Sequence, residues 1–159
     1  MTDNKSGFTL IEMMVILAII GVLTAFGGRS FIDSIAKNRI TTQVNEFVVT
    51  LQVARSEAVK RGATVNIIAT LGDVTTDEWG EGWRIETLDG ETLRVWESLK
   101  GNLTLDSIGG ISQFAISSQG TMDNTDTLEL CDATANTPGS QITLTITART
   151  RIQSGINCT

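Results

Sequence analysis

The chain has 159 residues, which suits one compact domain with one additional element, because a single core usually forms within about 100 to 200 residues. Its 12 Lys and Arg against 18 Asp and Glu give a net charge of -6, which argues against sequence-independent nucleic-acid binding by the protein as a whole. It contains no histidine and no tyrosine, and so lacks the commonest general base and the commonest nitrogen ligand for metals. We therefore expect a protein that is not an enzyme, with no catalytic residues, no metal, no cofactor and no small-molecule substrate.

Residues 8–28 form an apolar segment in which Glu12 is the single charge. A helix of this length is roughly 31 Å long, which matches the hydrocarbon core of a bilayer. A secretory signal peptide has its small-residue cleavage site after the apolar core, whereas here Ser6 and Gly7 precede it. Cleavage after Gly7 would leave the apolar helix on the mature chain, with Phe8 as the new N-terminus. We expect a transmembrane helix at residues 8–28, with the polar leader on the cytoplasmic side.

The stretch SGFTLIEMMVILAIIGVL resembles the class III signal of type IV pilins and type II secretion pseudopilins. In that signal a short leader ends in glycine, and phenylalanine and Thr-Leu-Ile-Glu then open an apolar helix. The resemblance implies that a prepilin peptidase cuts after Gly7 and N-methylates Phe8. It also makes Glu12 the fifth residue of the mature chain, a position that these families reserve for glutamate.

Glu12 is expensive to bury in a membrane, because a carboxylate at this depth costs about 2.5 kcal/mol or more without a partner. Processing supplies a partner, since it creates an amino group at Phe8 that a neighbouring subunit can bring to Glu12. Such a pair is several times stronger in a low-dielectric surrounding than in water and would fix the axial register of a filament. We interpret Phe8 and Glu12 as subunit-docking residues; the alternative is that Glu12 only reaches the membrane interface.

The helical pattern continues beyond the apolar segment, with apolar residues at the i, i+3, i+4 spacing of an amphipathic helix over residues 32–59. Lys60 and Arg61 followed by Gly62 are a typical C-terminal signal, so one helix of about 54 residues, roughly 80 Å, is predicted. Gly27 and Gly28 are a site for local bending or melting, and Arg29 stands where most pilins carry a proline. The predicted organisation is therefore a leader (1–7), a transmembrane and filament-core helix (8–28), an amphipathic helix continuing into the head (29–62) and a β-rich globular head (63–159).

After Gly62 the pattern changes to period 2, and the head is predicted to be mostly β-structure. The fold class is α+β, with a long N-terminal helix packed on a β-rich head, as in type IV pilins. Asp89-Gly90 predicts a hairpin with a type I′ turn, and Trp83 and Trp96 are expected to pack in the core rather than form a ligand platform. The predicted strands are residues 64–70, 83–88, 92–97, 103–106, 113–116, 127–131 and 141–147.

Two short features of the head have alternative interpretations. Cys131 and Cys158 have no CxxC spacing, and they would form a disulfide in an oxidising compartment or remain two separate buried thiols. A disulfide closing a loop of this size would stabilise the fold by about 3 to 4 kcal/mol. The segment MDNTDT offers Asp123, Asn124 and Asp126 as calcium ligands, but it has too few ligands for a dedicated loop, and we interpret it as a turn.

The head carries a second resemblance, to the H-type pseudopilins and to the minor pilins called FimT and FimU. It rests on VARSEAVKRGATV, FAISSQGTM, LELCD and QITLTITARTR, and thus covers almost the whole chain. In this group the two C-terminal cysteines usually pair. FimT-like pilins of transformable bacteria carry a Gly-Arg-x-Arg motif that contacts DNA, and Ala148, Arg149 and Arg151 match it with alanine in place of glycine.

The C-terminal arginines are therefore candidate DNA-binding residues. Residues 141–159 hold Arg149 and Arg151 and no acid, whereas residues 73–97 hold eight acids and two arginines. Two arginines can contact phosphates of double-stranded DNA without reading sequence. The alternative is that alternate residues of a terminal strand simply point into solvent.

Together these features favour a minor pilin at or near the tip of a type IV pilus, supporting its assembly. The alternative is an H-type minor pseudopilin of a type II secretion system with no DNA binding. The expected partners are a prepilin peptidase, other major and minor pilins or pseudopilins, and the inner membrane, with double-stranded DNA as a further candidate. We expect a single-pass protein of the inner membrane with a periplasmic head, which is later part of the tip of an extracellular pilus.

Overall fold

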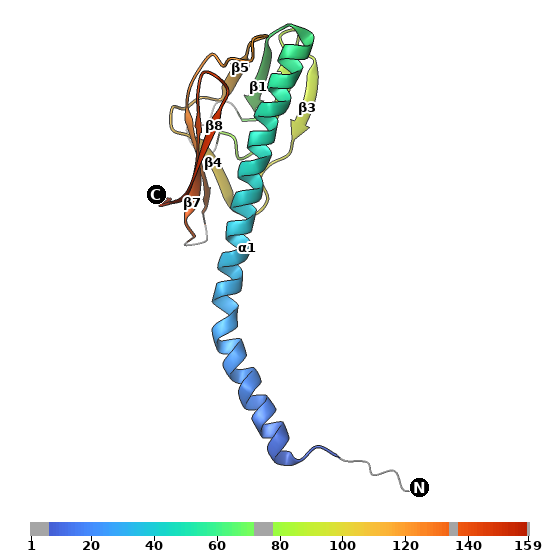
Figure 1. Cartoon of the computed structure of the whole chain (residues 1–159), viewed down its shortest axis with the longest axis vertical. Coiled ribbons are helices and arrows are strands. Elements are labelled where there is room, and N and C mark those ends of the chain that lie inside the picture. The colour runs from blue at the N-terminus through green and yellow to red at the C-terminus, as the bar shows by residue number, and fades with distance from the viewer. Residues whose placement is uncertain (1–6, 72–77, 134–136, 159) are drawn as a thin grey trace, which may run out of the picture. The chain divides into compact units, whose positions relative to one another are not determined.

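The computed structural model describes residues 7–71, 78–133 and 137–158, and within its helix the side chains of residues 24–32 are not described. The described chain consists of one helix, α1 (Leu10–Arg61), followed by eight strands (Figure 1). It forms two compact units, Met1–Ile35 and Ala36–Thr159.

Helix α1 begins and ends close to the predicted residues. Its backbone is helical through Gly27 and Gly28, so the structure shows no melting there, and bending at this pair stays a prediction. The helix ends because Gly62 has a φ of 64° and donates its N–H to the carbonyl of Val59, while Ala63 donates to the carbonyl of Ala58. These two bonds form a Schellman motif, the C-terminal arrangement that the Lys-Arg-Gly sequence predicts.

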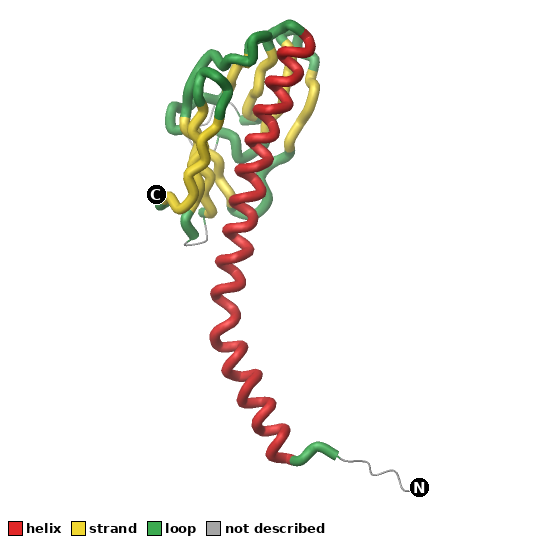
Figure 2. Tube along the Cα trace, viewed as in Figure 1, coloured by secondary structure: helices red, strands yellow, loops and turns green. Residues whose placement is uncertain are grey.

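The strands form two four-stranded antiparallel sheets. In the first sheet the order is β3-β2-β1-β5, and in the second it is β4-β6-β7-β8. Figure 2 shows the loops that connect them. The strands are β1 (Val65–Ala69), β2 (Trp83–Thr87), β3 (Thr92–Trp96), β4 (Leu103–Ser107), β5 (Gln113–Ile116), β6 (Thr127–Asp132), β7 (Gly139–Leu144) and β8 (Thr150–Ile156).

One hydrophobic core joins both sheets to the part of α1 that follows residue 35. The buried helix residues recur at helical spacing, and the buried strand residues alternate, so each element contributes one face. Every buried apolar residue of this cluster lies within Ala36–Thr159. The helix contributes Ile40, Val44, Phe47, Leu51, Ala54 and Ala58.

Aromatic side chains occupy the centre of this core. Phe47 of α1 contacts Trp79 and Trp83 edge-on, with ring centroids 5.4 Å and 5.3 Å apart. Trp83 stacks on Trp96, as expected for core tryptophans. The indole N–H of Trp83 donates to the hydroxyl of Thr50, 2.9 Å away, so this buried donor is paired on the helix.

All seven predicted strands are present; β5 has the predicted bounds, and the other six are shifted at one or both ends. The largest shift is in β7, which was predicted at residues 141–147 and begins and ends earlier. It ends at Leu144 because residues 145–149 form a turn closed by hydrogen bonds between Thr145 and Arg149 and between Ala148 and Thr145. The eighth strand, β8, was not among the predicted strands.

The predicted type I′ turn at Asp89-Gly90 is wrong, although the hairpin is present. Only Gly90 has a positive φ, 83°, whereas a type I′ turn requires positive φ at both central residues. Gly90 donates its N–H to the carbonyl of Thr87, and Thr87 donates to the carbonyl of Glu91. The loop therefore has three residues, with glycine in the left-handed conformation at its end.

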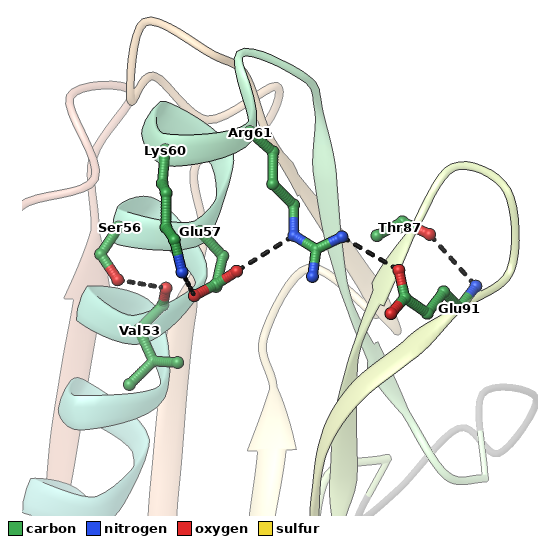
Figure 3. A network of polar contacts seen from close by, with 7 residues as sticks. All are labelled: Val53, Ser56, Glu57, Lys60, Arg61, Thr87 and Glu91. Atoms are coloured by element: carbon green, nitrogen blue, oxygen red, sulfur yellow. Dashed lines mark hydrogen bonds and ion pairs between the residues drawn. The ribbon is translucent and has the colours of Figure 1, made fainter.

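The end of α1 is tied to the β2–β3 hairpin by Arg61 (Figure 3). Its guanidinium donates to Glu57, 3.0 Å away on the same helix, and to Glu91, 2.9 Å away on the hairpin. The hydrogen bond from Arg61 is the main cause that lowers the pKa of Glu57, and the bonds to Glu57 and Glu91 raise the pKa of Arg61. This network is exposed, so its contribution to stability is modest and sensitive to salt.

Candidate functional site

The predicted processing and docking residues lie at the start of α1. Gly7 and Phe8 precede the helix, and the side chain of Phe8 is 71% exposed. The carboxylate of Glu12 accepts hydrogen bonds from the N–H and the hydroxyl of Thr9, each at 3.1 Å, and the N–H of Glu12 donates to that hydroxyl at 3.3 Å. Thr9 and Glu12 thus form a capping box, which pairs N–H groups that the first turn of a helix leaves free.

The capping box adds a local role for Glu12 to the predicted one. Its carboxylate is held at the helix start, on the side where the macrodipole favours a negative charge. The partner proposed from the sequence, an amino group at Phe8 of another subunit, lies outside a single chain, and that role stays a prediction.

The apolar residues of α1 between Leu10 and Leu23 are exposed in the single chain. Among the residues whose side chains are described, no helical stretch reaches the length and hydropathy required of a membrane span. The predicted segment, residues 8–28, extends past these residues.

The two cysteines form a disulfide that passes over a strand. Cys131 lies in β6 and Cys158 follows β8, and their Cα atoms are 5.8 Å apart. Strand β7 lies between β6 and β8, and its Gly139 sits under the bond. A Cβ atom at Gly139 would come within 2.5 Å of the Cys158 sulfur and 3.0 Å of the Cys131 sulfur, so the crossing requires glycine there.

The C-terminal arginines are exposed, and their backbones lie two residues apart. Arg149 closes the β7–β8 loop, and Arg151 lies in the edge strand β8 opposite Thr143. Since Ile142 is buried and strand residues alternate, Arg151 lies on the sheet face that points away from the core. Neither arginine has a carboxylate partner among the residues that the structure describes.

A cleft of about 340 Å³ lies between α1 and the β7–β8 loop, and Arg149 lines it. Arg55 of α1 lines the same cleft, and it was not predicted as a site residue. The remaining lining residues are Val48, Leu51, Gln52, Ala148 and Thr150. The structure thus brings Arg149 together with Arg55, while Arg151 is not among the lining residues.

Two segments that carried the resemblance of the head line this cleft, and a third lies against the side chain of Arg55. A Cβ atom at Gly120 would lie 2.6 Å from the Nε atom of Arg55, so this glycine leaves room for the arginine side chain. The turn that contains Gly120 is tied to the β7–β8 loop, because the N–H of Met122 donates to the carbonyl of Ile146 at 2.7 Å. Ala148 has a φ of 54°, at the position where the Gly-Arg-x-Arg motif has glycine.

In the segment MDNTDT, Met122 forms an isolated bridge with Ile116, Asp123 is a bend and residues 124–126 have no regular structure, so the segment is an irregular connection to β6 and not the expected hydrogen-bonded turn. Asp123 accepts a hydrogen bond from the N–H of Ala115 at 2.9 Å. Asp126 accepts hydrogen bonds from the hydroxyl of Ser107 and, at 3.0 Å, from the N–H of Gly109. Asp123 therefore bonds to strand β5, and Asp126 bonds to the end of β4 and the turn that follows it.

A long N-terminal helix that opens with a processing signal and packs on antiparallel sheets defines a pilin-like protein. The family described as Type II transport protein GspH matches residues 43–150, and the prokaryotic N-terminal methylation motif matches residues 2–27. The chain belongs to the Type II transport protein GspH family and is a type IV minor pilin or pseudopilin. The expectation that it is not an enzyme rests on membership of this family of structural proteins. The motif implies processing by a prepilin peptidase, and the family implies assembly with other pilins.

Two solved structures share the fold. The type IV minor pilin FimU of Pseudomonas aeruginosa superposes with a TM-score of 0.65 at 22% identity, over 77% of this chain and 97% of that chain. The minor pseudopilin EpsH from the Type 2 Secretion System of Vibrio cholerae superposes with a TM-score of 0.55 at 16% identity, over 73% and 97%. These likenesses confirm the predicted α+β pilin fold.

Curated relatives match over part of their length. A fimbrial protein of Pseudomonas aeruginosa is 37% identical over 73 residues, which cover 46% of this chain and 47% of that protein. The type IV major fimbrial protein FimA of Dichelobacter nodosus is 31% identical over 101 residues, 63% of this chain and 62% of that protein. The chain thus spans about half the length of the first of these relatives.

Proposed function

We propose that the chain is a minor subunit of a type IV pilus, incorporated at or near the tip and supporting pilus assembly. The observation that carries this proposal is the methylation motif joined to a helix whose apolar residues from Leu10 to Leu23 are exposed. A large exposed apolar surface is unfavourable in water. Lipid buries it before assembly, and the helices of neighbouring subunits bury it in a filament. The curated relatives, which are fimbrial proteins, support the same assignment.

In this proposal the prepilin peptidase removes residues 1–7, and Phe8 becomes the methylated N-terminus. Residues 8–28 span the inner membrane and later line the filament core, residues 29–62 continue into the head, and residues 63–159 form a periplasmic and then extracellular head. Mass spectrometry of the purified pilus fraction tests the cut. A mature N-terminus that begins at Phe8 with one added methyl group supports the proposal, and a chain that keeps residues 1–7 in the filament contradicts it.

The docking role of Glu12 is tested by Glu12→Gln. The amide side chain can still accept a hydrogen bond from Thr9, so the helix start is largely kept while the charge is lost. We expect normal levels of processed chain and a reduced fraction in sheared pili. Equal incorporation of the variant and the native chain would contradict a charge-dependent docking role. Thr9→Ala is the matched control, since it breaks the capping box and leaves the charge.

DNA contact through Arg149 and Arg151 is the further part of the proposed function. It is supported by the exposure of both side chains and by the lack of a carboxylate partner among the described residues. The test is a titration of fluorescent duplex DNA with the full-length chain in a non-ionic detergent, across salt concentrations. The double variant Arg149→Ala, Arg151→Ala should lose DNA binding and transformation, while the number of pili stays unchanged. Each phosphate contact contributes about 0.9 to the slope of log affinity against log salt, so the slope of the native chain shows how many contacts are lost.

Arg84→Ala is the control for loss of positive charge, because Arg84 lies in the other sheet and pairs with Glu86 at 3.2 Å. Equal loss of binding in this control would point to net charge alone. Loss of pili in the double variant would point to a structural role of the C-terminal arginines.

The second candidate is an H-type minor pseudopilin of a type II secretion system with no DNA binding. The family description and the likeness to EpsH favour it. Partners discriminate between the two candidates. Co-purification with other minor pilins supports the pilus, and co-purification with secretion pseudopilins supports the secretion system.

A further inference from the structure

We propose that Arg55 of α1 and Arg149 of the β7–β8 loop together bind one phosphate group of a nucleic-acid backbone in the cleft between them. This inference rests on the proposed DNA contact and deepens it by adding a residue from a distant part of the chain. Arg55 lies in the helix, almost a hundred positions before Arg149, and the fold brings both to one cleft.

The composition of the cleft suits an anion. Its lining contains two arginines and no carboxylate, and the other lining side chains are apolar or neutral. Arg61 and Arg84 differ from these two arginines, because each of them forms an ion pair with a glutamate. Arg55 and Arg149 have none among the residues that the structure describes, so their guanidinium groups remain available for a ligand.

Arg55 is exposed, and its side chain lies against one turn of the head. Its side chain covers Gly120, where an added Cβ would meet the Nε and Cγ atoms at 2.6 Å and 3.3 Å. The turn that carries Gly120 is hydrogen-bonded to the β7–β8 loop through Met122 and Ile146. An arginine whose side chain is packed loses less conformational entropy on binding, and its planar guanidinium suits a phosphate.

The arrangement of three arginines favours nucleic acid over a single carboxylate. Arg151 follows Arg149 by two residues, which is about 7 Å along an extended chain. A nucleic-acid backbone presents successive phosphates, so it can contact the cleft and Arg151 at once. A lone carboxylate would engage only one of these positions.

Arg55→Gln tests the inference in the full-length chain, in the same titration of duplex DNA against salt. We expect about tenfold weaker binding at low salt and a salt slope reduced by about one, as for the loss of one phosphate contact. Lys60→Gln is the matched control, since it removes one positive charge from the same helix outside the cleft. Its binding should change by less than about threefold. Arg55→Lys keeps the charge and should keep the salt slope.

The outcomes separate this inference from the proposed function. If Arg55→Gln binds DNA like Lys60→Gln while the Arg149 and Arg151 double variant does not bind, the role of Arg55 is overturned and the proposed DNA contact stands. If the native chain does not bind DNA at low salt, both fail. Thermal unfolding checks each variant. If Arg55→Gln does not fold, Arg55→Met takes its place, and DNA binding by Arg55→Met equal to that of Lys60→Gln overturns the inference.

Competition identifies the source of the anion. Poly-glutamate at equal charge concentration should displace the duplex poorly, and inorganic phosphate should displace it only at high concentration. Poly-glutamate could instead displace the labelled DNA as strongly as unlabelled duplex does, and this displacement could be absent in Arg55→Gln. That result would show that the cleft binds an acidic polypeptide and would overturn the nucleic-acid assignment.

Discussion

Thr50→Val tests the link between α1 and the first sheet. Thr50 is fully buried, and its hydroxyl accepts the indole N–H of Trp83 at 2.9 Å and donates to the carbonyl of Glu46 at 3.0 Å. Valine keeps nearly the same shape and has a similar helix propensity, but it removes the acceptor. The indole N–H then stays buried without a partner, which costs about 1 to 3 kcal/mol of unfolding free energy.

Thr42→Val is the matched control for this change. Thr42 lies on the same helix, is exposed, and its hydroxyl donates to the carbonyl of Asn38 at 2.8 Å. It therefore reports the loss of the same local helix bond without a buried donor. Urea unfolding followed by tryptophan fluorescence measures both variants, because all three tryptophans are buried within Ala36–Thr159.

We expect Thr50→Val to be less stable than Thr42→Val by about 1 to 3 kcal/mol, which is a fall of several degrees in Tm. Two variants within about 0.5 kcal/mol of each other would refute the reasoning, since the unpaired indole would then cost nothing. A change in the slope of unfolding against urea would instead indicate an altered compactness of one of the states.

Three further changes test other parts of the head. Ala148→Gly should raise the unfolding free energy by up to about 1 kcal/mol, because relief of a left-handed alanine outweighs the added freedom of the unfolded chain; a loss of stability in urea would contradict this. Glu57→Gln should remove part of the acid sensitivity: Arg61 lowers the pKa of Glu57, so this stabilisation is present above the ordinary value of 4.5 and is lost as the pH falls through the lowered value. Thermal unfolding at a series of acidic pH values measures that effect, and identical profiles for the variant and the native chain would exclude it. The double variant Cys131→Ser, Cys158→Ser should have an unfolding free energy about 3 to 4 kcal/mol below that of the native chain. A reductant should not change the urea midpoint of this variant any further.

The secondary structure could be predicted wherever one face of an element is buried. The part of the helix after residue 35 and strands such as β1 and β6 show the periods of 3.6 and 2, because their residues alternate between core and solvent. Strand β8 was missed because it is an edge strand, and residues 151–155 between its ends are all exposed. A strand without a buried face carries no hydrophobic period, and only its pairing with β7 defines it.

The turn before β8 could not be predicted from the sequence for a related reason. Ala148 adopts a left-handed conformation that sequence reasoning assigns to glycine or asparagine, so the loop was read as a continuation of β7. At Asp89-Gly90, by contrast, the turn residues predicted the hairpin but not its loop length. Turn residues fix where a chain reverses better than they fix its geometry.

The candidate site could be predicted only in part. Arg149 and Arg151 stood out because they lie in a segment without acids, and the structure leaves both exposed. Arg55 gave no comparable signal, since a single arginine on the polar face of an amphipathic helix is ordinary. Only the packing of α1 beside the β7–β8 loop reveals that it lines the cleft.

The disulfide over Gly139 determines how the second sheet bears mechanical load. Edge strand β8 is held to the sheet by hydrogen bonds with β7 alone, and a pull at its Arg149 end would break them one after another. That peeling stops at Cys158, because the bond to Cys131 transfers the tension past β7 to β6, an interior strand paired on both sides. Because Arg149 and Arg151 lie within the loop that the disulfide closes, a pull on them is shared between the chain that leads back to β7 and the bond that leads to β6.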